Sequence, residues 1–302
     1  NAKSVPLRLI AERDESNNSL AASTVEQVYK RILDDLTDAN IQALPDFDKA
    51  NPTETSTTRA TKGAAHMLKM RIYMAMGNWN AAIGEGEAVT DYELVSNVAS
   101  LFTSPYRSKE NIFSLPMNTN NRPNTQQSLP EYYNGVSANI LLVDVSAGIL
   151  SKDNYNLDSD VRVKSLINPD NNRLLKFTDA SNKLDWVPVF RFGETLLNLA
   201  ECYANVGGTD NETTAKGLLK QVRHRSVDSA TDPLNIDALT GDGLKEAISN
   251  ERRLELIGEG VRGLDITRKG ETFKKGSIEV KPTDGGYLWP IPQSEKLTNP
   301  AL

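Results

Sequence analysis

The sequence predicts a mainly α-helical protein in which tetratricopeptide-like helical hairpins form a scaffold with a long loop-rich insertion and little β-strand. Two segments carry the same hairpin pattern at an offset of 130 residues, at which Tyr73 aligns with Tyr203 and Gly77 with Gly207. Small residues, an aromatic side chain before the turn and a glycine at the turn are typical of tetratricopeptide packing. Between the hairpins, residues 101–190 lose helical periodicity, which predicts the insertion.

The first predicted helix covers residues 24–44, where apolar residues recur at helical spacing. Ser23 or Thr24 can cap its N-terminus, and Gln27 lies where a capping box places its second residue. Pro45 ends the pattern, because proline cannot continue a helix.

The remaining scaffold follows from the same signals. Residues 45–59 are polar and predict a loop, and residues 59–89 predict two helices joined at Gly77 and Asn78. The second hairpin covers residues 193–227. Two short strands are predicted at the borders of the insertion, in the segments ENIFSLPM (110–117) and VPVF (187–190).

Composition limits the function. The net charge of −6 and pI of about 5.2 argue against a nucleic-acid partner, which requires a basic surface. No stretch approaches the roughly 18 apolar residues that a transmembrane helix needs. The chain opens NAKSVPLRL, without the basic start and apolar run of a targeting segment. We therefore expect either a cytosolic protein or a mature chain whose leader has been removed.

The residues that most often hold metals or perform nucleophilic catalysis are sparse. Cys202 is the single cysteine, lies at helical spacing with apolar residues and is predicted to be a buried small side chain. His66 and His224 lie far apart and form no zinc-type pair. We predict no cofactor and no metal site.

A charged segment, NERRLELIGEGVRGLDITRKGE, covers residues 250–271. Its glutamates Glu251, Glu255 and Glu259 fall on one helical face, about 6 Å apart stepwise, which is within the range of glycosidase carboxyl pairs. The neighbouring arginines, however, would keep these acids ionised instead of raising a pKa. We therefore predict a structural role, with arginine–carboxylate pairs such as Glu259–Arg262 or Asp265–Arg268. The residues assigned to this role are Glu251, Arg252, Arg253, Glu255, Glu259, Arg262, Asp265 and Arg268.

Candidate ligand-binding residues lie in the insertion. Aromatic side chains next to amide and charged side chains are typical of a ligand-binding surface. Tyr132 and Tyr133 are adjacent, so they cannot both face one core, and they follow an amide-rich stretch. The candidates for ligand contact are Tyr132, Tyr133, Asn120, Asn121, Arg122, Gln126, Tyr106, Arg107, Tyr155 and Trp186.

Several segments, in order along the whole chain, resemble the SusD/RagB family of Bacteroidetes surface lipoproteins. They are VEQVYKRILDDLTDANIQALP, RATKGAAHMLKMRIYMAMGNWNAAI, YELVSNVASLF, LDSDVR, FRFGETLLNLAE, ERRLELIGEGVRGLDITRKG and YLWPIPQSEKLTNPAL. The family's N-terminal part, with its lipoprotein cysteine and further helices, has no counterpart in this chain. The resemblance implies one SusD-like domain over residues 1–302, divided into scaffold (1–100), ligand-binding loops (101–190) and C-terminal scaffold (191–302).

The resemblance also implies a function. Members bind a glycan at the outer surface of the outer membrane, without catalysis, and deliver it to a SusC-like TonB-dependent transporter. It implies membrane association through a lipid anchor that is not present in this chain. A helical adaptor that binds peptide or another nutrient remains an alternative, and a glycoside hydrolase is a weaker one.

Overall fold

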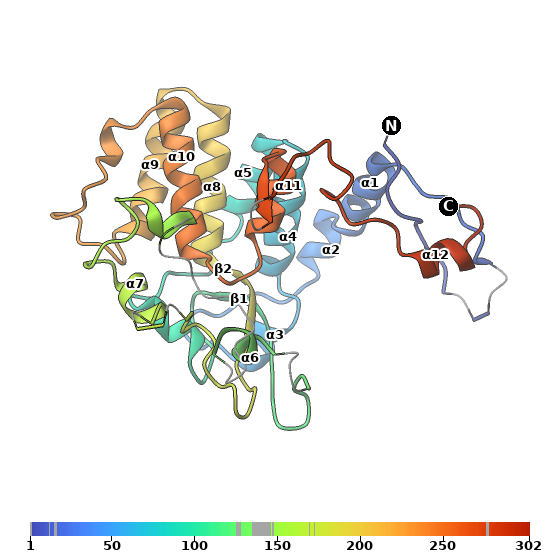
Figure 1. Ribbon diagram of the computed structural model, residues 1–302, viewed down its shortest axis with the longest axis horizontal. Coiled ribbons are helices and arrows are strands. Elements are labelled where there is room, and N and C mark those ends of the chain that lie inside the picture. The colour runs from blue at the N-terminus through green and yellow to red at the C-terminus, as the bar shows by residue number, and fades with distance from the viewer. Residues whose placement is uncertain are drawn as a thin grey trace. The chain divides into compact units, whose positions relative to one another are not determined.

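The structure, a computed structural model, shows helical hairpins as its main architecture (Figure 1). It describes residues 2–11, 13–14, 17–124, 128–134, 146, 148–168, 170–171, 173–275 and 278–302. The chain separates into two compact units, one made of Asn1–Asn40 with Gly263–Leu302 and the other of Ile41–Arg262. The proposed single SusD-like domain with its three parts stays a prediction.

The larger unit carries both hairpins. Its elements in chain order are α3 (Glu54–Thr58), α4 (Lys62–Ala75), α5 (Trp79–Glu87), the 3-10 helix η2 (Val98–Phe102), β1 (Asn111–Leu115), α6 (Leu129–Asn134), η3 (Gly148–Ser151), α7 (Val161–Leu166), β2 (Val187–Arg191), α8 (Phe192–Val206), α9 (Thr209–Arg223), η4 (Ile236–Ala238) and α10 (Gly241–Glu255). Helices α4 and α5 form the first hairpin, α8 and α9 form the second, and both α5 and α10 pack against α8. The prediction of a mainly helical, hairpin-based fold is confirmed.

Both hairpins turn through a glycine with left-handed backbone. Gly77 and Gly207 have φ angles of 71° and 74°, a region that glycine enters without the steric cost of a Cβ atom. After the first turn, the Asn78 side chain accepts a hydrogen bond from the Ala81 amide and caps α5. The glycines that aligned in the sequence therefore adopt the same left-handed backbone in the two turns.

The hairpins enclose two connected apolar layers. One joins α4 and α5 to both strands and to α8 around Met67, Met70, Ile112 and Cys202, each fully buried. The other lies between α8, α9 and α10. Cys202, predicted to be a buried small side chain, is 0% exposed.

Strands β1 and β2 form an antiparallel pair at the base of the insertion, and Asn111 is the register partner of Arg191. Strand β2 runs directly into α8, because Arg191 is the N-cap residue of that helix. In Figure 1 the loops of residues 103–124 and 173–186 extend from this pair, away from α8, α9 and α10. Both predicted strands are present.

The smaller unit contains α1 (Val25–Asp35), most of α11 (Arg262–Lys269), β3 (Phe273–Lys275), β4 (Ile278–Val280) and α12 (Gln293–Thr298), and α2 (Asp38–Gln42) crosses the unit boundary. Thr24 and Gln27 form the predicted capping box of α1. The expected single helix over residues 24–44 was wrong, because it breaks after Asp35. There the Thr37 hydroxyl accepts from the Asn40 amide and starts a new turn.

None of the helices in the described ranges combines the length and apolar character needed to cross a membrane.

Candidate functional site

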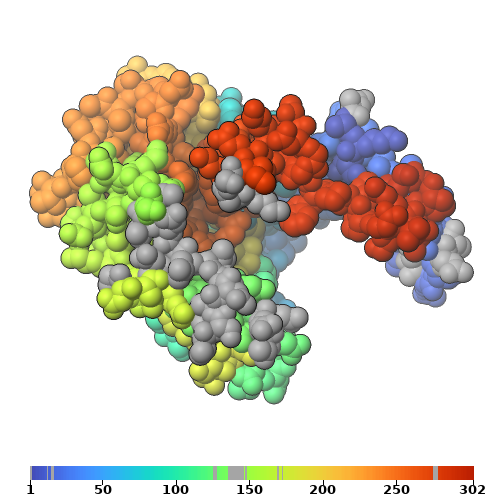
Figure 2. Space-filling model, in the orientation of Figure 1, coloured from blue at the N-terminus to red at the C-terminus, as the bar shows by residue number. Residues whose placement is uncertain are grey.

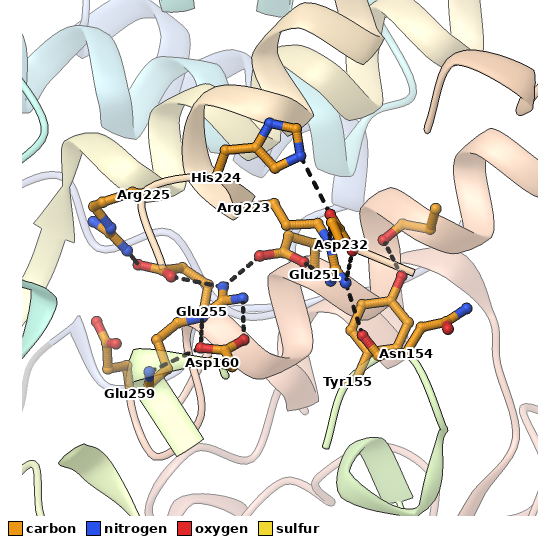
Figure 3. A network of polar contacts seen from close by, with 12 residues as sticks. Asn154, Tyr155, Asp160, Arg223, His224, Arg225, Asp232, Glu251, Glu255 and Glu259 are labelled. Carbon is orange, nitrogen blue, oxygen red and sulfur yellow. Dashed lines mark hydrogen bonds and ion pairs between the residues drawn. The ribbon is translucent and has the colours of Figure 1, made fainter. Parts of the chain in front are cut away.

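A buried network of arginines and carboxylates connects α10 to α7 and to the end of β2 (Figure 3). Glu251 and Glu255 project from α10 and are both 0% exposed. Arg162 comes from α7 and Arg191 from the end of β2, and each is 1% exposed. Buried charges of this kind are stable only when they are paired and hydrogen-bonded.

Glu255 lies at the centre of this network. Its carboxylate accepts hydrogen bonds from Arg191 Nη1 and Arg225 Nη2, each at 2.5 Å, and from Arg162 Nη1 at 3.1 Å. Burial alone would raise the pKa of the Glu255 carboxyl, but Arg225, Arg191 and Arg162 outweigh burial and hold the pKa well below its ordinary value. Glu255 is therefore ionised at neutral pH and is unsuited to act as a general acid.

Glu259 is held by two cations. Arg191 donates to it through Nε at 2.8 Å and Nη2 at 2.9 Å, and Lys176 Nζ lies 2.6 Å from Oε1. Burial raises the pKa of Glu259, while Arg191 and Lys176 lower it further than burial raises it, so the pKa lies below its ordinary value. This carboxyl also lacks the raised pKa of a glycosidase acid.

Arg162 ties Glu251 to the insertion. It donates to Glu251 and also reaches Asp160 through Nε at 3.0 Å and Nη2 at 2.8 Å. Arg223, at the end of α9, donates from Nη1 to the other oxygen of Glu251 at 3.1 Å. One carboxylate thus joins α10, α9 and the start of α7.

The other charged residues of the segment take different positions. Arg252 donates to Asn198 Oδ1 at 2.5 Å and to Glu194 Oε1 at 3.1 Å, both on α8. In the smaller unit, Arg268 donates to Asp265 through Nη2 at 2.9 Å, which is one of the expected local pairs. Arg253 on α10 and Arg262 at the start of α11 are half-buried.

The second feature is a group of loop residues built around two stacked aromatic rings. Tyr106 and Trp186 lie with ring centroids 5.8 Å apart and planes inclined by 17°, and both side chains are half-buried. We call this surface the aromatic loop face; its residues are Tyr106, Arg122, Asp179, Asn182, Asp185 and Trp186. The sequence named Tyr106 and Trp186 separately, and the structure brings them together.

Asp185 fixes the tyrosine of this pair. The Tyr106 hydroxyl donates to Asp185 Oδ1 at 2.7 Å, and the Asp179 amide donates to Asp185 Oδ2 at 2.8 Å. Burial and the hydrogen bond to Asp185 raise the pKa of Tyr106, so the phenol stays protonated and keeps donating. Two non-glycine residues in the described ranges have left-handed backbone, Tyr106 (φ 58°) and Lys183 (φ 62°), and both lie in these loops. Such conformations are costly and concentrate at functional sites.

Arg122 docks a second loop onto the same surface, since its Nη1 donates to the Asn182 carbonyl at 2.6 Å. The loop before it turns tightly, because Asn118 Oδ1 accepts from the amides of Asn120 and Asn121, each at 2.9 Å. Asn120 and Asn121 are exposed at this turn, and Arg107 is exposed next to Tyr106. Gln126 lies outside the described residues.

The adjacent tyrosines of α6 face different surroundings. Tyr132 is 39% exposed. Tyr133 stacks on Phe177 with ring centroids 5.9 Å apart, and its hydroxyl lies 3.4 Å from the Gly258 carbonyl. Lys183 Nζ lies 3.7 Å from Glu131, so α6 neighbours the turn that carries Asp185. Tyr132 is therefore the one of the two that is accessible to a ligand.

Tyr155 lies apart from the aromatic loop face. Its ring is 4% exposed, its hydroxyl donates to the Ala247 carbonyl at 3.2 Å, and the Arg223 guanidinium lies 5.2 Å from the ring centroid (Figure 3). Its neighbour Asn154 accepts from Arg223 Nη2 at 2.9 Å through its carbonyl.

Sequence reasoning missed Asp179, Asn182 and Asp185. A usable signal was present, because the segment TDASNKLD is rich in turn-forming residues and directly precedes Trp186. Asp179 Oδ1 accepts from the Asn182 amide at 2.9 Å, which is the local bond that such residues favour. Among the residues with described positions, no grouping of His, Cys, Asp and Glu could hold a metal ion.

These observations define a class of protein, a helical-hairpin scaffold that presents an aromatic and polar surface on its loops. Comparison with known proteins identifies the family. Residues 146–279 match the model of the SusD family. The chain is 55% identical to a SusD superfamily protein from Bacteroides fragilis whose crystal structure superposes with a TM-score of 0.93, covering 99% of this chain and 68% of that one. The chain belongs to the SusD/RagB family.

Two other relatives are more distant. SusD-like protein P38 from Formosa agariphila is 30% identical over 118 residues, which are 38% of this chain and 23% of that protein. The match thus spans less than a quarter of the length of this curated relative. Surface glycan-binding protein A from Bacteroides uniformis shares the fold, with a TM-score of 0.62 and 20% identity over 88% of this chain and 62% of that one.

Proposed function

We propose that this chain binds a glycan at the aromatic loop face and leaves it chemically unchanged. The observation that carries the proposal is the Tyr106–Trp186 stack, an aromatic pair held in place on exposed loops. Aromatic faces pack against the C–H face of a sugar ring, and polar groups around them pair with its hydroxyls. Because Asp185 holds Tyr106 in place, little conformational freedom of this ring is lost when a ligand binds.

Membership of the SusD/RagB family supports a carbohydrate ligand. Surface glycan-binding protein A, which shares the fold, is described by its name as binding glycans. Among the candidates from the sequence, Tyr106, Arg122 and Trp186 belong to the aromatic loop face. Tyr132, Asn120, Asn121 and Arg107 are exposed in the same loop-rich insertion.

The state of the buried acids supports binding without catalysis. A glycosidase needs one carboxylic acid whose pKa is raised so that it can protonate the leaving group. Glu255 and Glu259 have lowered pKa values and are held by arginine. They are buried structural counter-ions in this proposal, and neither is offered to a substrate.

The proposal extends to the cellular role that the family implies. The protein would act at the outer surface of the outer membrane and pass its glycan to a SusC-like TonB-dependent transporter. Weak binding suits this role, because a ligand that is handed on must also dissociate. A co-purification of the chain with such a transporter from its native membrane would test this part separately.

Replacement of Trp186 by alanine is expected to weaken glycan binding at least about tenfold, because truncating a central aromatic contact costs on the order of 2 kcal/mol. The measurement is affinity electrophoresis against plant, host and microbial polysaccharides, followed by calorimetry on the polysaccharide that binds. Tyr106→Phe, which keeps the ring but removes the bond to Asp185, is expected to cost less than Trp186→Ala.

Trp289→Ala is the matched control, because Trp289 is 98% exposed and lies in the other unit. It should leave affinity unchanged. Equal affinity of Trp186→Ala and the unmodified chain would remove the aromatic loop face from the proposal. Binding of peptides but of no polysaccharide would favour the peptide alternative, and release of shortened sugars would show an enzyme.

A further inference from the structure

A separate pocket of about 480 Å³ opens beside α10. The loop after η3, the segment before α10 and one face of α10 form its walls. In Figure 2 the green segment near residue 150 lies against the orange segment of residues 230–250, which are the two sides of this pocket. Its lining includes Lys152, Asp153, Tyr155, Glu246 and Asn250.

The α10 wall is regular. Gly243, Glu246, Ala247 and Asn250 recur at helical spacing and therefore share one face of the helix. Gly243 bears no side chain, and a Cβ atom built there would meet nothing within 4 Å. The wall is thus open at Gly243, whereas Asn250, further along the helix, is 6% exposed.

The polar groups of the pocket include both donors and acceptors. Lys152 Nζ donates to Glu246 Oε1 at 2.7 Å, which links the loop wall to the helix wall. This hydrogen bond keeps the pKa of Glu246 lowered, so the carboxylate stays ionised at neutral pH. Asp153 and Glu246 are two acidic residues of the lining, and Lys152 is a basic one. The excess of negative charge disfavours anionic ligands.

The apolar part lies next to these groups. Leu234 and Leu239 line the pocket together with Tyr155, whose ring is held by Arg223 and by the Ala247 carbonyl. A ligand that suits this lining needs hydroxyls that both donate and accept, a patch of C–H surface and no negative charge. A neutral sugar residue has all three properties.

We propose that this pocket is a second carbohydrate subsite that takes one neutral sugar residue. It shares no residue with the aromatic loop face, so it can bind independently of that surface. The class of ligand rests on the proposed function, whereas the position of the subsite rests on the pocket itself. A glycan bound at two points would be retained more firmly than one bound at either point alone.

Gly243→Leu is the variant that tests the subsite, because the leucine side chain would occupy the open part of the α10 wall. Leucine favours a helix more than glycine does, so folding should be preserved. Gly217→Leu on α9 is the matched control, since Gly217 is also an exposed helical glycine with nothing within 4 Å of a built Cβ. Both variants should melt at or above the temperature of the unmodified chain.

The measurement is a titration of the isotope-labelled chain with the methyl glycosides of glucose, galactose, mannose and xylose, followed by NMR. At least one glycoside is expected to shift the amide signals of Gly243 and Ala247. Gly243→Leu should raise the dissociation constant of that glycoside at least tenfold. Gly217→Leu and Trp186→Ala should leave the dissociation constant unchanged. Glucuronic acid should bind more weakly than the neutral sugar.

Three outcomes would overturn the subsite. These are no shift at residues 243–250 with any neutral glycoside, a shift that Gly243→Leu does not diminish, and tighter binding of glucuronic acid than of the neutral glycosides. Binding at the aromatic loop face is followed through a different NMR signal, that of the Trp186 indole N–H. Failure of one site is therefore distinguishable from failure of the other.

Discussion

Glu255→Gln is expected to lower the free energy of unfolding by about 3–5 kcal/mol, because it removes the anion that Arg162, Arg191 and Arg225 share. Glutamine has nearly the same size, so the loss is electrostatic and does not reflect a cavity. It leaves buried guanidinium groups with one counter-charge fewer, and a buried unpaired charge is among the most costly defects in a fold. Urea unfolding followed by circular dichroism measures the change.

Glu246→Gln is the control for this experiment, because it makes the same chemical change on the same helix at a side chain that is 66% exposed. A surface ion pair contributes at most about 1 kcal/mol, so the control should remain close to the unmodified chain. If Glu255→Gln were as stable as Glu246→Gln, the network would be dispensable and its proposed structural role would be wrong.

The second large effect is expected on acidification. Glu194, Glu255 and Glu259 are buried and have pKa values below the ordinary value of 4.5. In the unfolded chain these carboxyls take up protons near pH 4.5, while in the native protein they remain ionised. The unfolded state then binds more protons, so its relative free energy falls as the pH falls. Each pKa unit of difference is worth about 1.4 kcal/mol per group.

The contribution of these three groups should therefore be fully present at pH values above 4.5 and be lost progressively as the pH drops from 4.5 through their native pKa values. Urea unfolding at a series of pH values measures the slope. Glu255→Gln should show a shallower slope than the unmodified chain, because one of the three groups no longer titrates. A stability that is level or rises on acidification over this range would contradict the arrangement of charges described above.

The hairpins could be predicted because their signals are local. Apolar spacing defines a helix within a few turns, and Gly77 and Gly207 mark turns that need left-handed backbone. The break after Asp35 was missed because the helical pattern continues across it. The hydrogen bond from the Asn40 amide to the Thr37 hydroxyl starts a new turn in place of the continued helix. The spacing of apolar residues does not reveal this hydrogen bond.

The pairing of charges could be predicted only where it is local. Asp265 and Arg268 are three residues apart and do form a pair. The partners of Glu255 and Glu259 come from positions far away in the sequence, and Arg191, for example, is 64 residues from Glu255 and 68 from Glu259. Helical spacing shows that two glutamates share a face, but it does not show which element will cover that face.

The aromatic loop face shows the same limit. Aromatic residues in a polar, proline-rich insertion were sufficient to name Tyr106 and Trp186 as candidates. Their stacking depends on two loops that meet only in the folded chain, and Asp185 is 79 residues from the tyrosine it holds. Arg122 reaches Asn182 over 60 residues. Such contacts require the tertiary structure.

The buried network also separates two parts of the insertion that can change independently. Glu110, Arg162, Lys176 and Arg191 lie at the roots of the loops and are 0–1% exposed. Asn120, Asn121 and Arg107 are exposed. In the proposed function, substitutions at the exposed positions would alter ligand recognition without disturbing the buried charges. In the proposed function, a few such substitutions would change the ligand at little cost in stability, because substitutions of exposed side chains usually change stability little.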